Sequence, residues 1–197
     1  MADRRPDRRS PEAAQAVMRA ALELCAESGY RKLSIEGIAT RAGVGKNTIY
    51  RWWPSKAAVL MDALLSTLTV DAAFPDTGDI RADLIAQISA GARLLADPRT
   101  GPHYRALIGE AQHDPDVADA LWERLIGPLS AAATDRIRRA QQQGQLRAEA
   151  APDLIIELLY GPIYHRWLLT RRIPDDHRIA VLVNLALSGL TPTSSGV

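Results

Sequence analysis

Apolar residues recur every three to four positions through most of the chain, whereas the apolar–polar alternation typical of strands is scarce. The first pattern predicts a helix that begins at Ser10-Pro11-Glu12, where a capping hydroxyl, a proline and an acid stand together. Gly29 predicts its end near Ser28. The apolar side of this helix consists of Ala14, Val17, Ala21, Leu24 and Cys25.

Two shorter patterns follow, separated by a tight turn. The first begins after Ser34, a residue suited to N-capping, and ends before Gly43, in the usual place for a glycine that leaves a helix. The second runs from Lys46 to Trp53 and stops because the residue before Pro54 avoids the helical conformation. The inward faces hold Ile35, Ile38 and Ala39 in the first run, and Ile49 and Trp53 in the second.

The later patterns are helical as well, and together they predict an all-α fold of about nine helices. Asp79 is expected to cap a helix after the loop at residues 74–78, and Gly127-Pro128 predicts a kink or a short break. The last two helices are apolar on more than one side, so each faces more than one neighbour. Helices are predicted at about 55–70, 80–96, 102–112, 114–143, 152–172 and 176–189.

Two short helices joined by a glycine-bearing turn form a helix-turn-helix, whose second helix is shaped to enter a DNA major groove. On spacing alone, a packed pair of helices with an ordinary polar face explains the pattern equally well. The outward positions of the second helix carry groups that donate hydrogen bonds to phosphates and base edges. These positions are Lys46, Asn47, Thr48, Tyr50 and Arg51.

The distribution of charge along the chain favours a nucleic-acid partner, as the helix-turn-helix motif does. Residues 1–60 hold eleven Lys or Arg and six Asp or Glu, a net of +5, and the remaining residues hold thirteen bases and seventeen acids, a net of −4. A basic end on an acidic body is typical of nucleic-acid binding, although chance clustering produces it too. We expect residues 1–9 to be a disordered basic arm.

The region around the two short helices resembles the DNA-binding segment of TetR-type (tetracycline-repressor) regulators. One departure is the tryptophan pair Trp52-Trp53, where the family has a histidine or tyrosine followed by a phenylalanine. Residues 144–169 also resemble one C-terminal subtype of that family, through Gly144-Gln145-Leu146-Arg147, Asp153 and residues 161–166. The matching N-terminal residues are Gly29-Tyr30, Leu33-Ser34-Ile35, Ile38-Ala39, Ala42-Gly43-Val44, Thr48-Ile49-Tyr50 and Pro54-Ser55-Lys56.

The resemblance implies a DNA-binding domain at residues 10–56, a connecting helix and loop at 57–78, and a regulatory and dimerisation domain at 79–197. Lys46, Asn47 and Thr48 are expected to reach base edges, because they stand at the N-terminal end of the reading helix. Phosphate contacts are expected from Ser34, Tyr50, Trp52 and Lys56, and by resemblance Thr40 and Arg41 also lie near DNA.

The second domain needs a ligand site only if it is a sensor. Aromatic residues with polar groups are candidates for an apolar cavity, although aromatics at helical spacing are more often core or dimer contacts. The family pairs its last two helices into a four-helix dimer interface, and their excess apolar surface here favours a homodimer independently. The candidate pocket residues are His103, Tyr104, Trp122, Tyr160, Tyr164, His165 and Trp167.

The sequence gives little support for a metal site, a cofactor site or a catalytic site. The four histidines are scattered without ligand spacing, so we expect no metal and no cofactor, and no nucleophile-plus-base pattern suggests an enzyme. Cys25 is alone and stands on an apolar helix face, which favours a core role in a reducing compartment. No apolar run suggests a membrane span or signal peptide, so a cytoplasmic protein is expected.

These observations predict a ligand-responsive transcriptional regulator, most simply a repressor that binds a pseudo-palindromic operator as a dimer. Two other functions remain open: an architectural DNA binder without effector, and a regulator-like scaffold with an enzymatic or protein-partner role. Steep salt dependence of DNA binding distinguishes the regulator and the architectural DNA binder from the scaffold, because contacts with phosphates require it.

Overall fold

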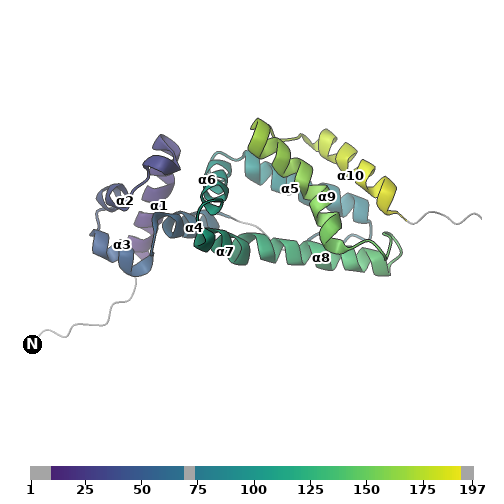
Figure 1. Ribbon diagram of the computed structural model, residues 1–197, viewed down its shortest axis with the longest axis horizontal. Helices are drawn as coiled ribbons and strands as arrows, with labels where there is room; N and C mark the ends of the chain where they lie inside the picture. The colour runs from purple at the N-terminus through teal and green to yellow at the C-terminus, as the bar shows by residue number, and fades with distance from the viewer. Residues whose placement is uncertain (1–9, 69–73, 192–197) are drawn as a thin grey trace, which may run out of the picture. The chain divides into compact units, whose positions relative to one another are not determined.

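The computed structural model describes residues 10–68 and 74–191, and every regular element within these ranges is helical (Figure 1). The all-α prediction is therefore confirmed. The expected arm at residues 1–9 and the end of the helix expected to reach residue 70 lie outside the described ranges. Contacts divide the chain into two units, Met1–Thr69 with Pro102–Leu121 and Val70–Gly101 with Trp122–Val197.

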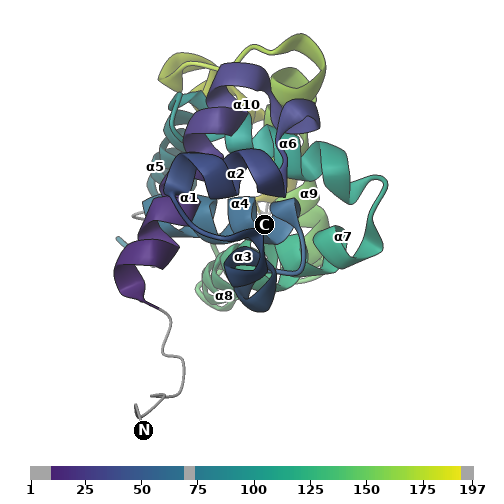
Figure 2. The same ribbon diagram turned by 90° about the vertical axis from the view of Figure 1, so that its left-hand side faces the viewer.

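The first unit is built around α1 (Pro11–Ser28), which packs against α2 (Ile35–Ala42) and α4 (Lys56–Thr67). A short 3₁₀ turn, η1 (Tyr30–Lys32), joins α1 to α2, and α3 (Lys46–Trp52) packs on α2. Figure 2 shows α1 and α2 packed together. Their common core includes the fully buried Val17, Ala21, Ile38, Ile49 and Leu60.

Local capping explains where the first helices begin and end. The hydroxyl of Ser34 accepts a hydrogen bond from the backbone N–H of Gly37 at 3.1 Å, and Ser55 does the same for Ala58 at 3.2 Å. Gly43 adopts a left-handed conformation with φ of 67°, which a residue without Cβ accepts without strain. The predicted helix–turn–helix is thus formed where the sequence indicates it.

Two further helices, α6 (Gly101–Ala111) and α7 (Pro115–Leu121), group with the N-terminal unit apart from Gly101, the first residue of α6. Helix α7 contacts α4, and its buried residues are Val117 and Leu121. The boundaries expected from sequence, which place residues 79–197 in one domain, divide the chain differently from this contact grouping and stay a prediction. The pattern gives helix positions but carries little information on which helices share a core.

The second unit contains α5 (Ile80–Ala96), α8 (Gly127–Gln142), α9 (Pro152–His165) and α10 (Asp176–Leu190). Helix α5 packs on α10, and α9 packs on both α8 and α10. A π-helical turn, η3 (Arg166–Thr170), extends α9 and buries Trp167 completely. Other buried core residues are Leu84, Ile88, Ile137, Leu159 and Val183.

The break expected at Gly127-Pro128 takes a different form. The chain stays helical through a π turn, η2 (Trp122–Ile126), and α8 follows directly with Pro128 in its first turn. Because the helical run is continuous here, the N–H that Pro128 lacks would have donated to the preceding turn, and the π turn is where the helix accommodates this loss. Gly127 is required in the turn, since an added Cβ would lie 2.9 Å from the carbonyl oxygen of Trp122.

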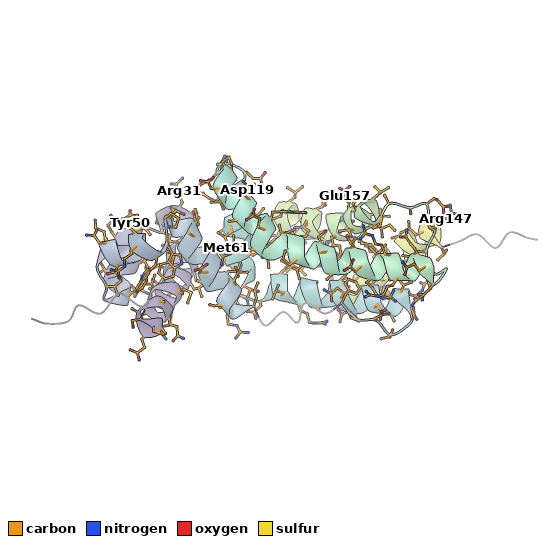
Figure 3. All side chains as sticks on the ribbon, turned by 90° about the horizontal axis from the view of Figure 1, so that it is seen from below. Arg31, Tyr50, Met61, Asp119, Arg147 and Glu157 are labelled. Atoms are coloured by element: carbon orange, nitrogen blue, oxygen red, sulfur yellow. The ribbon has the colours of Figure 1, made fainter. Side chains whose placement is uncertain are left out.

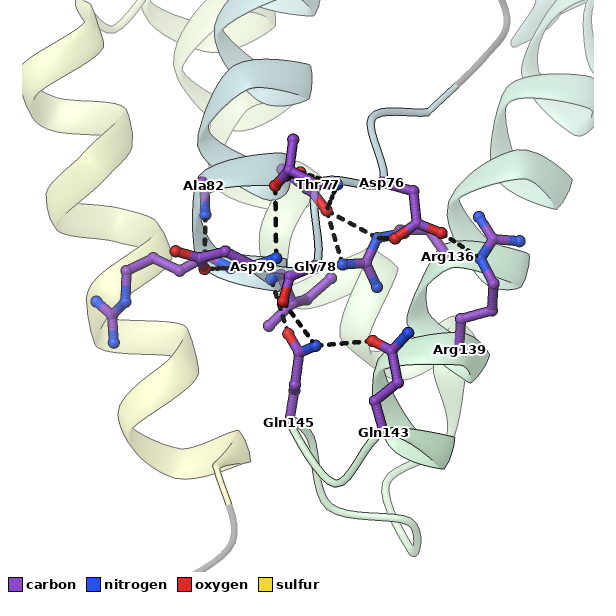
Figure 4. A network of polar contacts seen from close by, with 12 residues as sticks. Asp76, Thr77, Gly78, Asp79, Ala82, Arg136, Arg139, Gln143 and Gln145 are labelled. Atoms are coloured by element: carbon purple, nitrogen blue, oxygen red, sulfur yellow. Dashed lines mark hydrogen bonds and ion pairs between the residues drawn. The ribbon is translucent and has the colours of Figure 1, made fainter.

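A buried ion pair ties the start of α5 to α8 within the second unit. Nη2 of Arg136 lies 2.7 Å from Oδ2 of Asp83, and both side chains are fully buried. Thr77 donates to the same carboxylate through its hydroxyl at 2.7 Å and its backbone N–H at 3.2 Å. Figure 4 shows the surrounding network, in which Asp76 bridges Arg136 and Arg139. The loop before α5 is thereby held in place.

Candidate nucleic-acid interface

Helix α3 presents one apolar and one polar face. Ile49 is completely buried and Trp53, which follows the helix, is 2% exposed, so both predicted core positions are confirmed. Tyr50 is 53% exposed and is labelled in Figure 3. Lys46, Asn47 and Arg51 are also exposed, and Thr48 is half-buried. The structure therefore places the predicted α3 residues on one accessible surface.

The first residue of α3 forms an ion pair with α2. Nζ of Lys46 donates to Oε1 of Glu36 at 3.0 Å, and both side chains are more than half exposed. This hydrogen bond lowers the pKa of Glu36 and raises the pKa of Lys46. Lys46 thus stays charged, but its charge is partly neutralised beside the surface that would face DNA.

The two tryptophans at the end of α3 have different environments. The indole N–H of Trp53 donates to Oδ2 of Asp62 on α4 at 2.7 Å, which fixes its ring in the core. Trp52 is half-buried, lies edge-on to Trp53 with centroids 5.6 Å apart, and has the guanidinium of Arg51 5.5 Å from its ring. A tryptophan at position 53 therefore fills the place where the family has phenylalanine, and its polar atom has a partner.

Arg41 links α2 to α1 through ion pairs. Its guanidinium donates to Glu27 at 2.9 and 3.0 Å and to Glu23 at 3.3 Å. These contacts lower the pKa of Glu27 through its hydrogen bond with Arg41. Thr40, its neighbour, is exposed. Sequence reasoning named Arg41 as a residue near DNA and missed the two α1 carboxylates that hold it.

Lys56 also has partners inside the first unit. Its ammonium group donates to the carbonyl oxygens of Tyr30 at 3.2 Å and Leu33 at 3.0 Å, and lies 4.4 Å from the centroid of the Tyr30 ring. Burial, followed by the nearby Glu110, raises the pKa of the Tyr30 hydroxyl. Lys56 therefore holds η1 against α4, and Ser34 caps α2 in the same region.

The expected pocket residues divide between the two units. His103 and Tyr104 are buried in α6 of the first unit, whereas the other five belong to the second unit. Trp122 is 57% exposed, and Trp167 is fully buried with its ring centroid 6.0 Å from that of Tyr164. Tyr160 is half-buried, and burial raises its pKa.

A groove of about 550 Å³ lies between α9, η3 and α10. Of the expected pocket residues, only His165 lines it. Sequence reasoning missed the cationic residues Arg166 and Arg178, because they come from separate helices and no spacing rule joins them. The groove is lined by Pro162, His165, Arg166, Thr170, Arg178 and Leu182.

Over residues 10–68 and 74–191, no group of three or more His, Cys, Asp or Glu is arranged to hold a metal ion. Among the helices of the same ranges, none combines the length and apolar character needed to cross a membrane.

Comparison with known proteins identifies the family. Residues 17–63 match the family of bacterial regulatory proteins described as tetR family, and residues 74–186 match the tetracyclin repressor-like C-terminal domain. An uncharacterised HTH-type regulator, YdeS of Bacillus subtilis (strain 168), is 36% identical over 92% of this chain and 91% of its own.

Two other similar proteins are also described as TetR regulators. The DNA-binding transcriptional repressor TetR of Mycobacteroides abscessus is 31% identical over 86% of this chain and 88% of its own. The crystal structure of the TetR family transcription regulator SCO0332 has a TM-score of 0.68 at 37% identity, covering 92% of this chain and all of that one. The chain belongs to the TetR family of helix-turn-helix transcriptional regulators.

Proposed function

We propose that this regulator is a homodimeric repressor that binds a pseudo-palindromic operator and is released from it by a small molecule. The observation that carries the proposal is the accessible polar face of α3, with Ile49 and Trp53 buried behind it. A short helix held firmly by its apolar side presents its opposite side to a major groove.

Within that face, we assign base reading to Lys46, Asn47 and Thr48, at the N-terminal end of α3. An amide such as that of Asn47 pairs with adenine through two hydrogen bonds, which gives sequence information. Tyr50, Arg51, Trp52 and the exposed Thr40 are assigned to phosphates. Ser34, Arg41 and Lys56 support the same surface through their contacts within the protein.

The dimer is assigned to α9 and α10. Large apolar side chains remain exposed on α9, on α10 and on the η3 turn that follows α9, including Leu154 at 61%, Leu185 at 70% and Leu169 at 73%. A monomer would leave this surface in water, whereas a second copy would bury it. Two-fold symmetry would then place two α3 helices about 34–36 Å apart, in successive major grooves.

The effector site is assigned to the interior of the second unit. Nη1 of Arg136 and Oγ of Ser89 are buried there without a hydrogen-bond partner, which is uncommon for interior polar atoms. A small molecule with hydrogen-bond acceptors would satisfy such groups. It would release DNA if it bound better to the conformation in which the two α3 helices are wrongly spaced.

Fluorescence anisotropy with labelled duplex DNA tests this function. The proposal predicts binding whose affinity falls steeply as salt rises, because Lys and Arg release counterions from the phosphates. It also predicts that a small organic molecule binding the second unit lowers DNA affinity. Absence of DNA binding by the folded dimer at low salt would contradict the proposal, and binding that no effector releases would favour an architectural role.

A further inference from the structure

The exposed face of α9 changes charge along its length. Glu157, Gly161 and His165 follow one another at intervals of four residues, so they form one ridge, and all three are exposed. The core residues Ile155, Leu159 and Ile163 lie on the opposite side of the helix. The ridge therefore begins with an acid, has no side chain at its centre, and ends with a base.

The basic end of the ridge opens into the groove between α9 and α10. His165, Arg166 and Arg178 line this groove, and Nε of Arg166 is buried without a hydrogen-bond partner. Two acids at the start of α10 have other partners than the groove's side-chain cations: Asp175 accepts from the backbone amide of Arg178, and Asp176 lies 3.5 Å from Arg93. Among the ion pairs of the described chain, none neutralises the cations of the groove.

The acidic end has the complementary arrangement. Glu157 is exposed on α9, where Figure 3 labels it, and the ion pairs of the described residues do not include it. Glu157 and His165 lie equally far from Gly161, about 6 Å along the helix axis on either side. Two antiparallel copies of α9 that cross at Gly161 would therefore place each acid beside the basic groove of the other copy.

We propose that a second copy of this chain docks with its α9 antiparallel across Gly161, and that its Glu157 enters the groove beside His165 and Arg166. This inference rests on the proposed dimer and specifies its register. Gly161 permits close approach of the two helices because it carries no side chain. The space above it is open, since a Cβ built there meets no atom within 4 Å. The exposed Leu154 and Leu158 would be covered on both sides of the crossing.

Charge reversal tests the pairing in the full-length protein. Glu157→Arg and His165→Glu each place like charges together, so each should raise the dimer dissociation constant about tenfold or more. The double variant restores opposite charges and should return the constant close to that of the wild type. Analytical ultracentrifugation measures all four proteins, with Glu149→Arg, an exposed charge reversal outside α9, as the matched control.

Disulfide trapping tests the register separately. Gly161→Cys should form a covalent dimer under mild oxidation, because a disulfide needs Cα atoms within about 7 Å. The wild type, whose single Cys25 is buried, and Glu149→Cys should not. A dimeric wild type in which the double reversal fails to rescue, or only His165→Glu weakens association, would overturn this pairing and leave the dimer intact. A monomeric wild type would overturn the dimer as well.

Discussion

Nζ of Lys46 lies 3.0 Å from Oε1 of Glu36, so the first residue of α3 is paired with α2. Both groups are exposed, and the pair is accordingly screened by salt. In the proposed complex, Glu36 would draw Lys46 away from DNA and would also repel phosphates.

Removing that acid should strengthen DNA binding. Glu36→Gln frees the ammonium group of Lys46, and we expect tighter binding at low salt, with the gain shrinking as salt rises. Anisotropy titrations at two salt concentrations measure the effect. Glu12→Gln, which removes an exposed acid from the start of α1, serves as the control and should change affinity less. Equal or weaker binding by Glu36→Gln would count against Lys46 as a DNA contact.

Alanine substitutions of Asn47 and Tyr50 should have different effects on DNA binding. Asn47→Ala removes an amide assigned to a base edge, so discrimination at one position of the half-site should fall by about 1–3 kcal/mol. Tyr50→Ala removes a group assigned to a phosphate and should weaken binding to all sequences similarly. Competition among single-base operator variants separates the two effects. An unchanged preference in Asn47→Ala would show that the base-reading face is wrongly assigned.

Lys56 should affect folding stability as well as DNA binding. Lys56→Met removes hydrogen bonds to the carbonyl oxygens of Tyr30 and Leu33, and the free energy of unfolding should fall by about 1–3 kcal/mol. DNA affinity should fall for all sequences, because η1 and the start of α4 lose their attachment. Urea denaturation measures the stability, with Lys32→Met, an exposed residue of η1, as control. A fully stable variant that still loses DNA affinity would instead indicate a direct phosphate contact.

Replacing only one partner of the buried Asp83–Arg136 pair should lower the free energy of unfolding strongly. Arg136→Met leaves a buried carboxylate without its cation and should lower the free energy of unfolding by about 3–5 kcal/mol. Adding Asp83→Leu should recover much of the loss, because an apolar pair needs no compensation. Arg138→Met, at an exposed position of the same helix, should change stability little. A double variant no better than Arg136→Met would contradict this account.

His103 should make the protein less stable as pH falls. Its ring is 2% exposed, Nδ1 has no hydrogen-bond partner, and burial lowers its pKa from the ordinary value near 6.5. The unfolded chain therefore binds a proton more readily than the folded chain, so stability present above that value is lost below it. Thermal unfolding at pH 7.5 and at successively lower pH should show this loss, and His103→Phe should reduce it. An identical pH dependence in both proteins would exclude His103 as its source.

The sequence predicted the elements whose causes are local. Ser34 caps α2 three residues away, Gly43 ends the same helix by its left-handed backbone, and Ile49 follows helical spacing. These features depend on neighbours within a few positions, so a pattern is enough to find them. The outward face of α3 follows from the same periodicity.

The contacts that needed the structure join residues distant along the chain. Asp83 and Arg136 are 53 positions apart, and Lys56 reaches carbonyl oxygens 23 and 26 positions earlier. No residue pattern encodes a lysine that bonds to backbone oxygens, because every residue supplies one. The partners of Arg41 are also distant along the chain, since Glu27 and Glu23 of α1 lie 14 and 18 positions earlier, and no spacing rule joins them to it.

Selection of bound sequences from a randomised DNA pool tests the central claim most directly. The account predicts enrichment of an inverted repeat whose half-sites are centred about one helical turn apart, because two α3 helices would read successive major grooves. Asn47→Ala should enrich a repeat altered within each half-site. Failure of the folded, dimeric wild type to enrich any sequence, including after cell extract is added to supply a missing co-ligand, would contradict the account.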